Sequence, residues 1–268
     1  MILHRRSILL AAGATAAAAS PLAALAQGRD AALAAAIAGA ARTPANKVRD
    51  PFRHPAESLS FWGLKPGMTV LEINPGGGGY WTEILAPYLK ATGGHYIATG
   101  ARPERFADEA VFGKTTWVPF NAQSGPLAPA GSVDLVITAR NIHNWMWSAG
   151  MLDKAFKDFH AALKPGGLLG VEEHRAEPKP MVPEARNGYV AQAHVIAEAQ
   201  KFGFKLDATS EINANPKDDK DHPFGVWTLP PNRRSSAGQN QPSPAGFDRA
   251  AFDAIGESDR MTLRFKKA

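Results

Sequence analysis

Short apolar stretches alternate with segments of helical spacing along most of this chain. Five apolar stretches are typical of buried strands: residues 69–74, 95–98, 115–120, 131–138 and 168–172. Between them apolar residues recur every three or four positions, as over 151–163, where Leu152, Phe156 and Phe159 share one helix face. Because strands that alternate with helices favour parallel crossovers, the pattern predicts an α/β fold: a largely parallel sheet with helices on both faces.

The pattern changes near the carboxyl terminus. After a predicted helix over 187–202, two apolar stretches, 204–212 and 260–266, have no long helix between them and are free to pair antiparallel. The connection over 213–259 is long for a compact domain and rich in Pro, Asn, Ser and Gly, with one or two helical turns expected near 247–255. Such a connection is either a lid over a site or a disordered insertion.

The amino-terminal segment 1–26 is typical of an export signal. Arg5-Arg6 precede an apolar run that is too short to span a bilayer, and residues 24–26 offer a small-x-small cleavage site. The paired arginines resemble a twin-arginine signal, with an ordinary secretory signal as the alternative. We therefore predict a periplasmic protein with no integral membrane segment after signal removal. It would have a helical extension over 27–49 and one main domain over 50–268.

Composition narrows the function further. The formal net charge is +5, and two of the positive charges lie in the export segment, so the sequence does not favour nucleic acid as a partner. The chain contains no cysteine, which excludes disulfides, thiolate metal sites and a cysteine nucleophile. The remaining candidate partners are small molecules or components of the cell envelope.

The most informative motif joins the first predicted strand to the next helix. It reads Glu72-Ile-Asn-Pro-Gly-Gly-Gly-Gly-Tyr80. A helix start offers unpaired backbone N–H groups, and glycines let a ligand approach the main chain closely. In open α/β sheets ligands bind at the carboxyl ends of the strands, so the motif predicts a nucleotide or nucleoside site. Four successive glycines are entropically costly for a purely structural turn, which is the alternative interpretation.

A dehydrogenase is the first rival interpretation of this motif. A dinucleotide-binding loop needs glycines at relative positions one, three and six. Counting from Gly76, the sixth position is Trp81, and counting from Gly77 it is Thr82. Neither register fits, so an oxidoreductase with a nicotinamide cofactor is a distant alternative.

The spacing that does fit is acid-x-x-x-Gly-x-Gly, with Glu72, Gly76 and Gly78, and it resembles motif I of the class I S-adenosylmethionine-dependent methyltransferases. The segments 132–138 and 163–172 resemble the later motifs of that superfamily. The resemblance implies a Rossmann-like, doubly wound, mostly parallel seven-stranded sheet with a carboxyl-terminal antiparallel strand pair. The chain is also similar to a group of predicted exported bacterial methyltransferases, through these segments: residues 53–57, 173–175, 215–218 and 259–265.

The resemblance implies S-adenosyl-L-methionine as the cofactor and a set of contact residues. The expected contacts lie in the glycine motif, after the second and third strands, and after the fourth strand: Glu72, Asn74, Pro75, Gly76, Gly77, Gly78, Thr99, Asn121, Arg140 and Asn141. The chain departs from the superfamily at two places. Asn74 replaces a usual glycine, and residues 98–102 lack the acid that would bind ribose hydroxyls, leaving Thr99 a single weaker contact.

Candidate catalytic residues follow the fourth and fifth strands. His143, in a loop with neighbouring amides and tryptophans, could remove a proton from an acceptor while the indoles form a wall. Glu173 and His174 follow the fifth strand, and alternation turns Glu172 and Glu173 to opposite faces. The alternatives are a backbone-bonded loop histidine and a solvated charge cluster. A metal held by His143, His174 and Glu173 is considered, but a magnesium ion would prefer more carboxylates, and we predict none.

The leading hypothesis is therefore an exported methyltransferase that uses S-adenosylmethionine and acts on an unidentified small or medium-sized acceptor. Export creates a difficulty, because the cofactor is made in the cytoplasm. The alternative is a non-catalytic periplasmic protein that binds a nucleoside or another ligand on a methyltransferase scaffold. The missing acid after the second strand and the presence of Asn74 favour that alternative.

Overall fold

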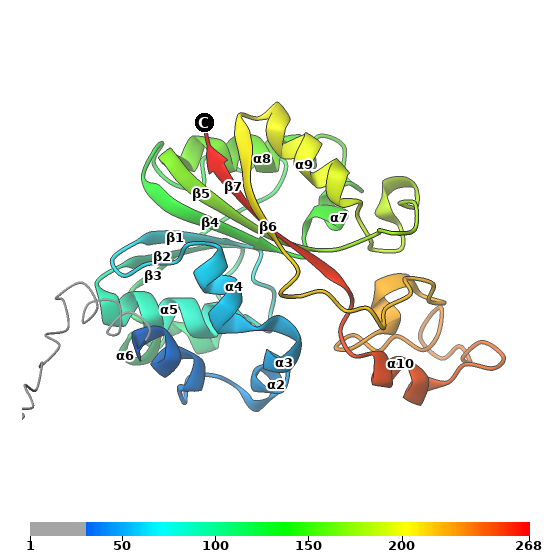
Figure 1. The fold of residues 1–268 in the computed structure, drawn as a ribbon. Coiled ribbons are helices and arrows are strands. Elements are labelled where there is room, and N and C mark those ends of the chain that lie inside the picture. The colour runs from blue at the N-terminus through cyan, green and yellow to red at the C-terminus, as the bar shows by residue number, and fades with distance from the viewer. Residues whose placement is uncertain (1–30) are drawn as a thin grey trace, which may run out of the picture.

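The computed structural model describes residues 31–268, and its centre is one seven-stranded sheet (Figure 1). The strand order is β3-β2-β1-β4-β5-β7-β6, and β7 runs antiparallel to both of its neighbours, while the other neighbouring strands are parallel. The strands are β1 Thr69–Ile73, β2 His95–Thr99, β3 Thr115–Val118, β4 Val133–Ala139, β5 Leu163–His174, β6 Phe204–Ser210 and β7 Arg260–Lys267. The predicted fold class and the antiparallel terminal strands are confirmed.

Helices cover both faces of the sheet (Figure 1). Phe156 and Phe159 of α8 pack with Val195 of α9 against one face, and Leu59 of α4 packs with Leu85 of α5 against the other. The longer helices are α4 Pro55–Phe61, α5 Thr82–Thr92, α8 Met151–Ala162, α9 Gln192–Lys201 and α10 Arg249–Ile255. The shorter ones are α2 Pro44–Lys47, α3 Asp50–Arg53, α6 Glu109–Phe112 and α7 Ile142–Trp145. The two apolar layers bury most residues of β1 and β4, as their largely apolar sequences predict.

Several boundaries differ from the sequence prediction. The helix expected over 50–64 is interrupted at His54, whose φ is +40°, because the proline that follows disfavours helical geometry at the residue before it. The helix expected from 187 begins at Gln192, since Val190 forms an isolated bridge with Arg175. β5 begins at Leu163, so the turn expected at Lys164–Gly167 is part of the strand.

The long connection 213–259 is tied to the sheet at both ends. Asn213 Nδ2 donates to Thr262 Oγ1 at 3.0 Å, and Asn215 N donates to Asp259 Oδ1 at 2.9 Å. The connection contains the 3₁₀ turn η3 Gly225–Thr228 and α10, which lies within the turns expected at 247–255. Figure 1 shows these loops gathered with α10 beside the sheet. This segment therefore has a defined place next to the strand ends.

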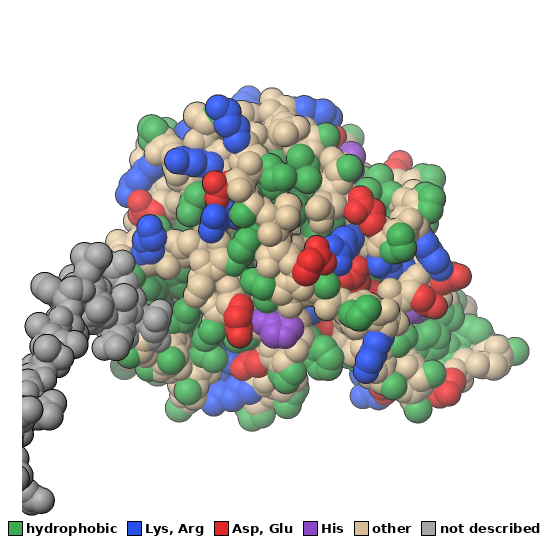
Figure 2. Space-filling model, in the orientation of Figure 1, with side chains coloured by type: hydrophobic (Ala, Val, Ile, Leu, Met, Phe, Trp, Pro, Cys, Tyr) green, Lys and Arg blue, Asp and Glu red, His purple; other side chains and the backbone are tan. Residues whose placement is uncertain are grey.

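The expected export segment 1–26 and the first residues of the expected helical extension lie outside the described residues. Within 31–268, residues 31–38 are helical, and none of the helices is both long and apolar enough to cross a membrane. On the face drawn in Figure 2, basic and acidic side chains lie interspersed. Such a mixture of basic and acidic side chains is typical of a solvent-exposed protein surface.

Candidate functional site

The glycine loop after β1 contains two glycines that the fold itself does not require. Gly77 and Gly78 have backbone conformations open to other residues, and a Cβ built on either meets nothing of the described chain within 4 Å. Gly79 differs, because its φ is +46° and a Cβ there would lie 2.4 Å from the Phe106 ring. One glycine is thus explained by packing, while Gly77 and Gly78 leave open space above the main chain.

The loop presents unused backbone donors. The N–H groups of Gly76, Gly77 and Gly78 donate no hydrogen bond within residues 31–268. The Gly78 carbonyl is held from outside, by Asn46 Nδ2 at 2.7 Å and Arg105 Nη2 at 2.6 Å. The loop is therefore fixed through its carbonyl while its N–H groups remain available to a ligand.

Glu72 lies beneath this loop rather than in it. Its Oε2 accepts hydrogen bonds from Tyr96 Oη at 2.6 Å and Thr82 Oγ1 at 2.9 Å, and only 2% of the residue is exposed. Burial raises the pKa of this carboxyl to about 7, and the two hydroxyl donors only partly offset that effect. The carboxyl joins β1, β2 and the start of α5. A cofactor contact from Glu72 stays a prediction that these partners do not favour.

Thr99 and Asn74 are engaged with each other. The Asn74 N–H donates to Thr99 Oγ1 at 2.7 Å, and that hydroxyl lies 3.1 Å from Asn74 Oδ1. Asn74 adopts a φ of +46°, which asparagine tolerates better than most residues, so it serves where a glycine is usual in the motif. Pro75, half-buried, follows it. The hydrogen bonds between Asn74 and Thr99 tie the start of the glycine loop to the end of β2.

The other expected cofactor contacts sit at successive strand ends. Asn121 follows β3, is exposed, and its Oδ1 accepts from the Gln123 N–H in a local turn. Asn141 Nδ2 donates to the Ile73 carbonyl at 2.9 Å, which ties the end of β4 to the end of β1. Arg140 has a φ of +61°. Asn121 thus lies after β3, and Arg140 and Asn141 lie after β4, with β2 and β1 between these two strands. Because the four strands are parallel, the residues lie along the same edge of the sheet.

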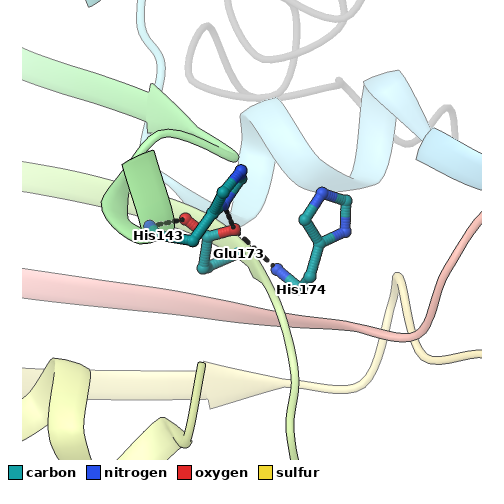
Figure 3. A group of neighbouring side chains, drawn as sticks. All are labelled: His143, Glu173 and His174. Atoms are coloured by element: carbon teal, nitrogen blue, oxygen red, sulfur yellow. Dashed lines mark hydrogen bonds and ion pairs between the residues drawn. The ribbon is translucent and has the colours of Figure 1, made fainter. Parts of the chain in front are cut away.

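His143 and Glu173 form a buried pair at the ends of β4 and β5 (Figure 3). His143 Nδ1 lies 2.9 Å from Glu173 Oε1. The same carboxylate accepts backbone N–H bonds from Ile142 at 2.7 Å, from His143 at 3.3 Å and from His174 at 2.9 Å. Glu173 is therefore an acceptor fixed by α7 and its own strand, so His143 Nδ1 donates to it. Nε2 is left as a proton acceptor, the arrangement of an oriented general base.

His174 is a second imidazole beside the first. The ring centroids of His143 and His174 lie 5.4 Å apart, and His174 Nδ1 lies 2.5 Å from Ser258 Oγ. Burial, together with the charges of His143 and Arg140, holds the pKa of His174 well below its usual value. His174 is consequently neutral at physiological pH.

The three residues also form a geometric metal-ligand set. One ligand atom from each of His143, Glu173 and His174 lies within 4.8 Å of the others. Both Glu173 oxygens already accept N–H bonds, however, and donors directed at a carboxylate disfavour a cation there. The chemistry of this set fits an oriented base better than a metal site.

The two histidines line a cavity of about 260 Å³. The long connection supplies much of its wall. Its lining residues are Arg140, His143, Asn144, His174, Val226, Trp227, Leu229, Pro230, Pro231, Asn232, Glu257 and Ser258. A neighbouring hollow of about 440 Å³ shares Asn144, Trp227 and Asn232 with it and adds Trp147. The connection 213–259 therefore borders the site, as a lid would.

The tryptophans after β4 have separate roles. Trp147 lines the outer hollow, and its ring centroid lies 5.7 Å from that of Trp227. Trp145 is 4% exposed and packs in the core against Phe120 and Phe159. The expectation that these indoles form a wall holds for Trp147 and is wrong for Trp145, because the first turn of α7 directs Trp145 into the apolar layer.

Known proteins share this architecture. No family model matches the chain. The [4+2]-cyclase SpnF superposes with a TM-score of 0.53 at 13% identity, over 90% of this chain and 94% of that one. A SAM-dependent methyltransferase from Aquifex aeolicus gives a TM-score of 0.49 at 20% identity, over 64% and 88%. The seven-stranded sheet of this chain is thus shared with SpnF. At these identities the likeness concerns the fold alone.

A sequence relative adds to this. The chain is 29% identical over 141 residues to the ubiquinone/menaquinone biosynthesis C-methyltransferase UbiE of Hydrogenovibrio crunogenus, covering 49% of this chain and 52% of the relative. The chain thus spans about half the length of this curated relative. The similarity to this methyltransferase is therefore confined to about half of either chain.

Sequence reasoning missed part of this site. Trp227 and Ser258 border the cavity from the connection that sequence analysis left open between lid and disorder. Glu257 belongs to a buried charge cluster with Arg53, and the helical spacing of Arg49 and Arg53 was the one available signal. His222, also in the long connection, has a side chain only 1% exposed that bonds Asp218.

Proposed function

We propose that this chain is an S-adenosylmethionine-dependent methyltransferase that acts on a small acceptor held in the His143 cavity. Gly77 and Gly78 carry the cofactor half of the proposal, because neither is required by backbone conformation or packing. Glycine at such positions is explained by a ligand that comes close to the main chain. The class I fold and the similarity to UbiE support the same conclusion.

The residues around the glycine loop suit this cofactor. The N–H groups of Gly76–Gly78 would face its polar groups, with Asn141 and Arg140 beyond them at the end of β4. When bound, S-adenosylmethionine supplies a methyl group whose bond to the sulfonium breaks as the acceptor atom bonds to carbon, leaving a neutral sulfide. The chain's part is to hold both partners in line.

His143 is the proposed base. Glu173 fixes its ring and keeps the proton on Nδ1, so Nε2 is able to take the proton that an acceptor hydroxyl or amine loses. His174, neutral and hydrogen-bonded to Ser258, lines the same cavity and would position the acceptor. The buried setting excludes bulk water from the transfer.

A matched glycine pair tests the cofactor half. Gly77→Ala adds a methyl group where the fold has room, so its thermal midpoint should match wild type while calorimetry shows weaker S-adenosylhomocysteine binding, by about tenfold or more. Gly125→Ala is the control, since Gly125 also has open space but lies outside the glycine loop. Equal affinity in all three proteins, or no binding to wild type, would reject the proposal.

A methyl-transfer assay separates the catalytic proposal from a non-catalytic binding protein. A methyltransferase should transfer labelled methyl groups to a component of a cell-envelope or small-molecule extract, and His143→Asn should abolish that transfer. Tight S-adenosylhomocysteine binding without transfer to any extract would favour the binding protein instead.

We also propose that the protein is exported to the periplasm through its paired arginines. Arg5-Arg6 and the apolar run after them support this, as does a chain without cysteine, which an oxidising compartment leaves unchanged. Fractionation of cells that express the full chain should place it in the periplasm. Replacing Arg5 and Arg6 with lysine should retain it in the cytoplasm, whereas unchanged export would point to an ordinary secretory signal.

A further inference from the structure

A cluster of buried charges lies against the inner end of the cavity, and its charges do not balance. We call it the arginine cluster, and it consists of Arg49, Arg53, Arg140 and Arg260 with Glu172 and Glu257. Arg260 Nη1 lies 2.9 Å from both Glu172 Oε1 and Glu257 Oε2, and Arg53 Nε lies 2.9 Å from Glu257 Oε2. Four guanidinium groups thus share two carboxylates, and the excess charge is positive.

Several donors of the cluster have no acceptor. Arg53 is fully buried, and its Nη1 and Nη2 have no hydrogen-bond partner among residues 31–268. The centroid of the Tyr80 ring lies 4.7 Å from the Arg53 guanidinium carbon. The ring offsets part of the guanidinium charge, but it accepts no hydrogen bond from the N–H groups in the guanidinium plane. Buried donors without partners are costly, so such a group in a native protein calls for a ligand or another explanation.

Arg140 connects the cluster to the cavity. It lines the cavity together with Glu257, and its guanidinium makes no hydrogen bond within the described chain. The nearest carboxylate oxygen, Glu172 Oε1, is 3.8 Å from its Nε. The guanidinium is therefore available to an anion that enters the cavity, and a carboxylate matches its fork-shaped set of donors.

Another part of the cavity lining suits a flat apolar group. The Trp227 ring centroid lies 5.9 Å from that of His143, and Leu229, Pro230 and Pro231 continue the apolar surface. A space of about 260 Å³ admits one small ring with short substituents. The cavity thus combines a basic end, an aromatic side and the base His143.

We propose that the methyl acceptor is a small planar aromatic acid whose carboxylate pairs with Arg140 while its ring lies against Trp227. This substrate class rests on the proposed methyltransferase function. The cofactor's own carboxylate is the other source of the same chemistry, and the experiment below separates the two.

The test compares benzoate with benzamide, which has nearly the same shape but no charge, by calorimetry without cofactor. Wild type should bind benzoate about tenfold more tightly or better, because a charge-assisted pair with Arg140 is lost in the amide. Arg140→Gln should lose the preference, and Arg140→Lys should keep part of it. Lys157→Gln, which removes an exposed positive charge on α8, should keep all of it.

Three results would overturn the inference. They are equal affinity of wild type for benzoate and benzamide, an unchanged preference in Arg140→Gln, and a loss of S-adenosylhomocysteine affinity in Arg140→Gln with unchanged benzoate binding. The last result would assign the guanidinium to the cofactor. The comparison of the two ligands on wild type needs neither a variant nor a cofactor, so it stands apart from the outcome for the methyltransferase function.

Discussion

One continuous segment, residues 74–80 after β1, makes the glycine loop, whereas the cavity at the carboxyl ends of β4 and β5 is assembled from segments far apart in sequence. The loop owes its shape to backbone conformation, with Asn74 and Gly79 both at positive φ. The cavity owes its shape to pairs such as Arg53–Glu257, which are 204 residues apart. A local motif should keep its function as long as the sheet folds. A site assembled from distant segments depends on the position of every one of those segments.

The largest effect is expected at the base on the cavity side. His143→Asn preserves a donor toward Glu173 but removes the proton acceptor, so kcat of methyl transfer should fall by about 10²- to 10⁴-fold. S-adenosylhomocysteine affinity, measured by calorimetry, should stay unchanged, because the proposed function assigns that binding to the glycine loop.

His95→Asn provides the matched control for this variant. His95 is an exposed histidine at the amino end of β2 whose ring bonds Thr116, and its replacement should leave both quantities at wild-type values. If His143→Asn lost cofactor binding as well, the two halves of the site would be one unit and the comparison would fail.

The cavity side of the site, which is assembled from distant segments, should also lose stability when one carboxylate is removed. Glu257→Gln leaves Arg49, Arg53 and Arg260 with less compensation in a buried setting, so the free energy of unfolding in urea should drop by about 3–5 kcal/mol. Glu211→Gln, at a carboxylate that is 67% exposed, should change it by less than about 1 kcal/mol.

The loss at Glu257 should depend on pH. Burial raises the pKa of Glu257, but Arg53, Arg260 and Arg49 outweigh it and lower that pKa to about 2. Because the folded pKa is below the unfolded one, the stabilisation is complete above about pH 4.3 and is lost as the pH falls towards 2. The stability gap between wild type and Glu257→Gln should therefore close in acid. If the difference in the free energy of unfolding did not change with pH, the destabilisation by Glu257→Gln would come from packing and not from charge.

The same contrast separates what sequence can and cannot predict. The sheet, its order of elements and the glycine loop follow from local patterns: apolar runs, helical spacing, and an acid-to-glycine spacing beginning at Glu72. His143 and Glu173 were singled out because both follow strands whose carboxyl ends meet at one edge. Their direct pairing could not be derived, since it depends on α7, a helix of four residues that shows no periodicity.

The arginine cluster was beyond sequence reasoning for a different reason. Arg53 and Arg260 look like ordinary surface charges in the sequence, and only tertiary packing makes them buried. The partners of Glu72 were also beyond sequence reasoning, because period-two alternation tells which face a residue takes but not whether a helix covers that face. The pairing with Tyr96 and Thr82 required knowing how α5 crosses the strand.

Glu72 offers a smaller test, within the glycine-loop half. Its pKa in the fold is raised to about 7 by burial, so its ionised form destabilises the protein as the pH rises from about 4.5 through 7. Glu72→Gln removes that ionisation and should be more stable than wild type at pH 8, by up to about 3 kcal/mol, with no difference at pH 4. Urea unfolding at the two pH values measures this.

Glu109→Gln, at an exposed carboxylate, should show no such trend. S-adenosylhomocysteine affinity is the second readout for Glu72→Gln. An unchanged affinity would make Glu72 a structural residue below the loop, while a marked loss would restore it as a cofactor contact.

The smallest effect concerns how the amino-terminal helices hold the glycine loop. Asn46→Ala removes the 2.7 Å bond to the Gly78 carbonyl, which Arg105 still binds, so the free energy of unfolding should fall by only about 1 kcal/mol. Asn121→Ala, in an exposed local turn, should change it by less than about 0.5 kcal/mol. If Asn46→Ala cost several times more, the loop would depend on distant partners as strongly as the cavity does. The distinction between a local and an assembled half of the site would then be lost.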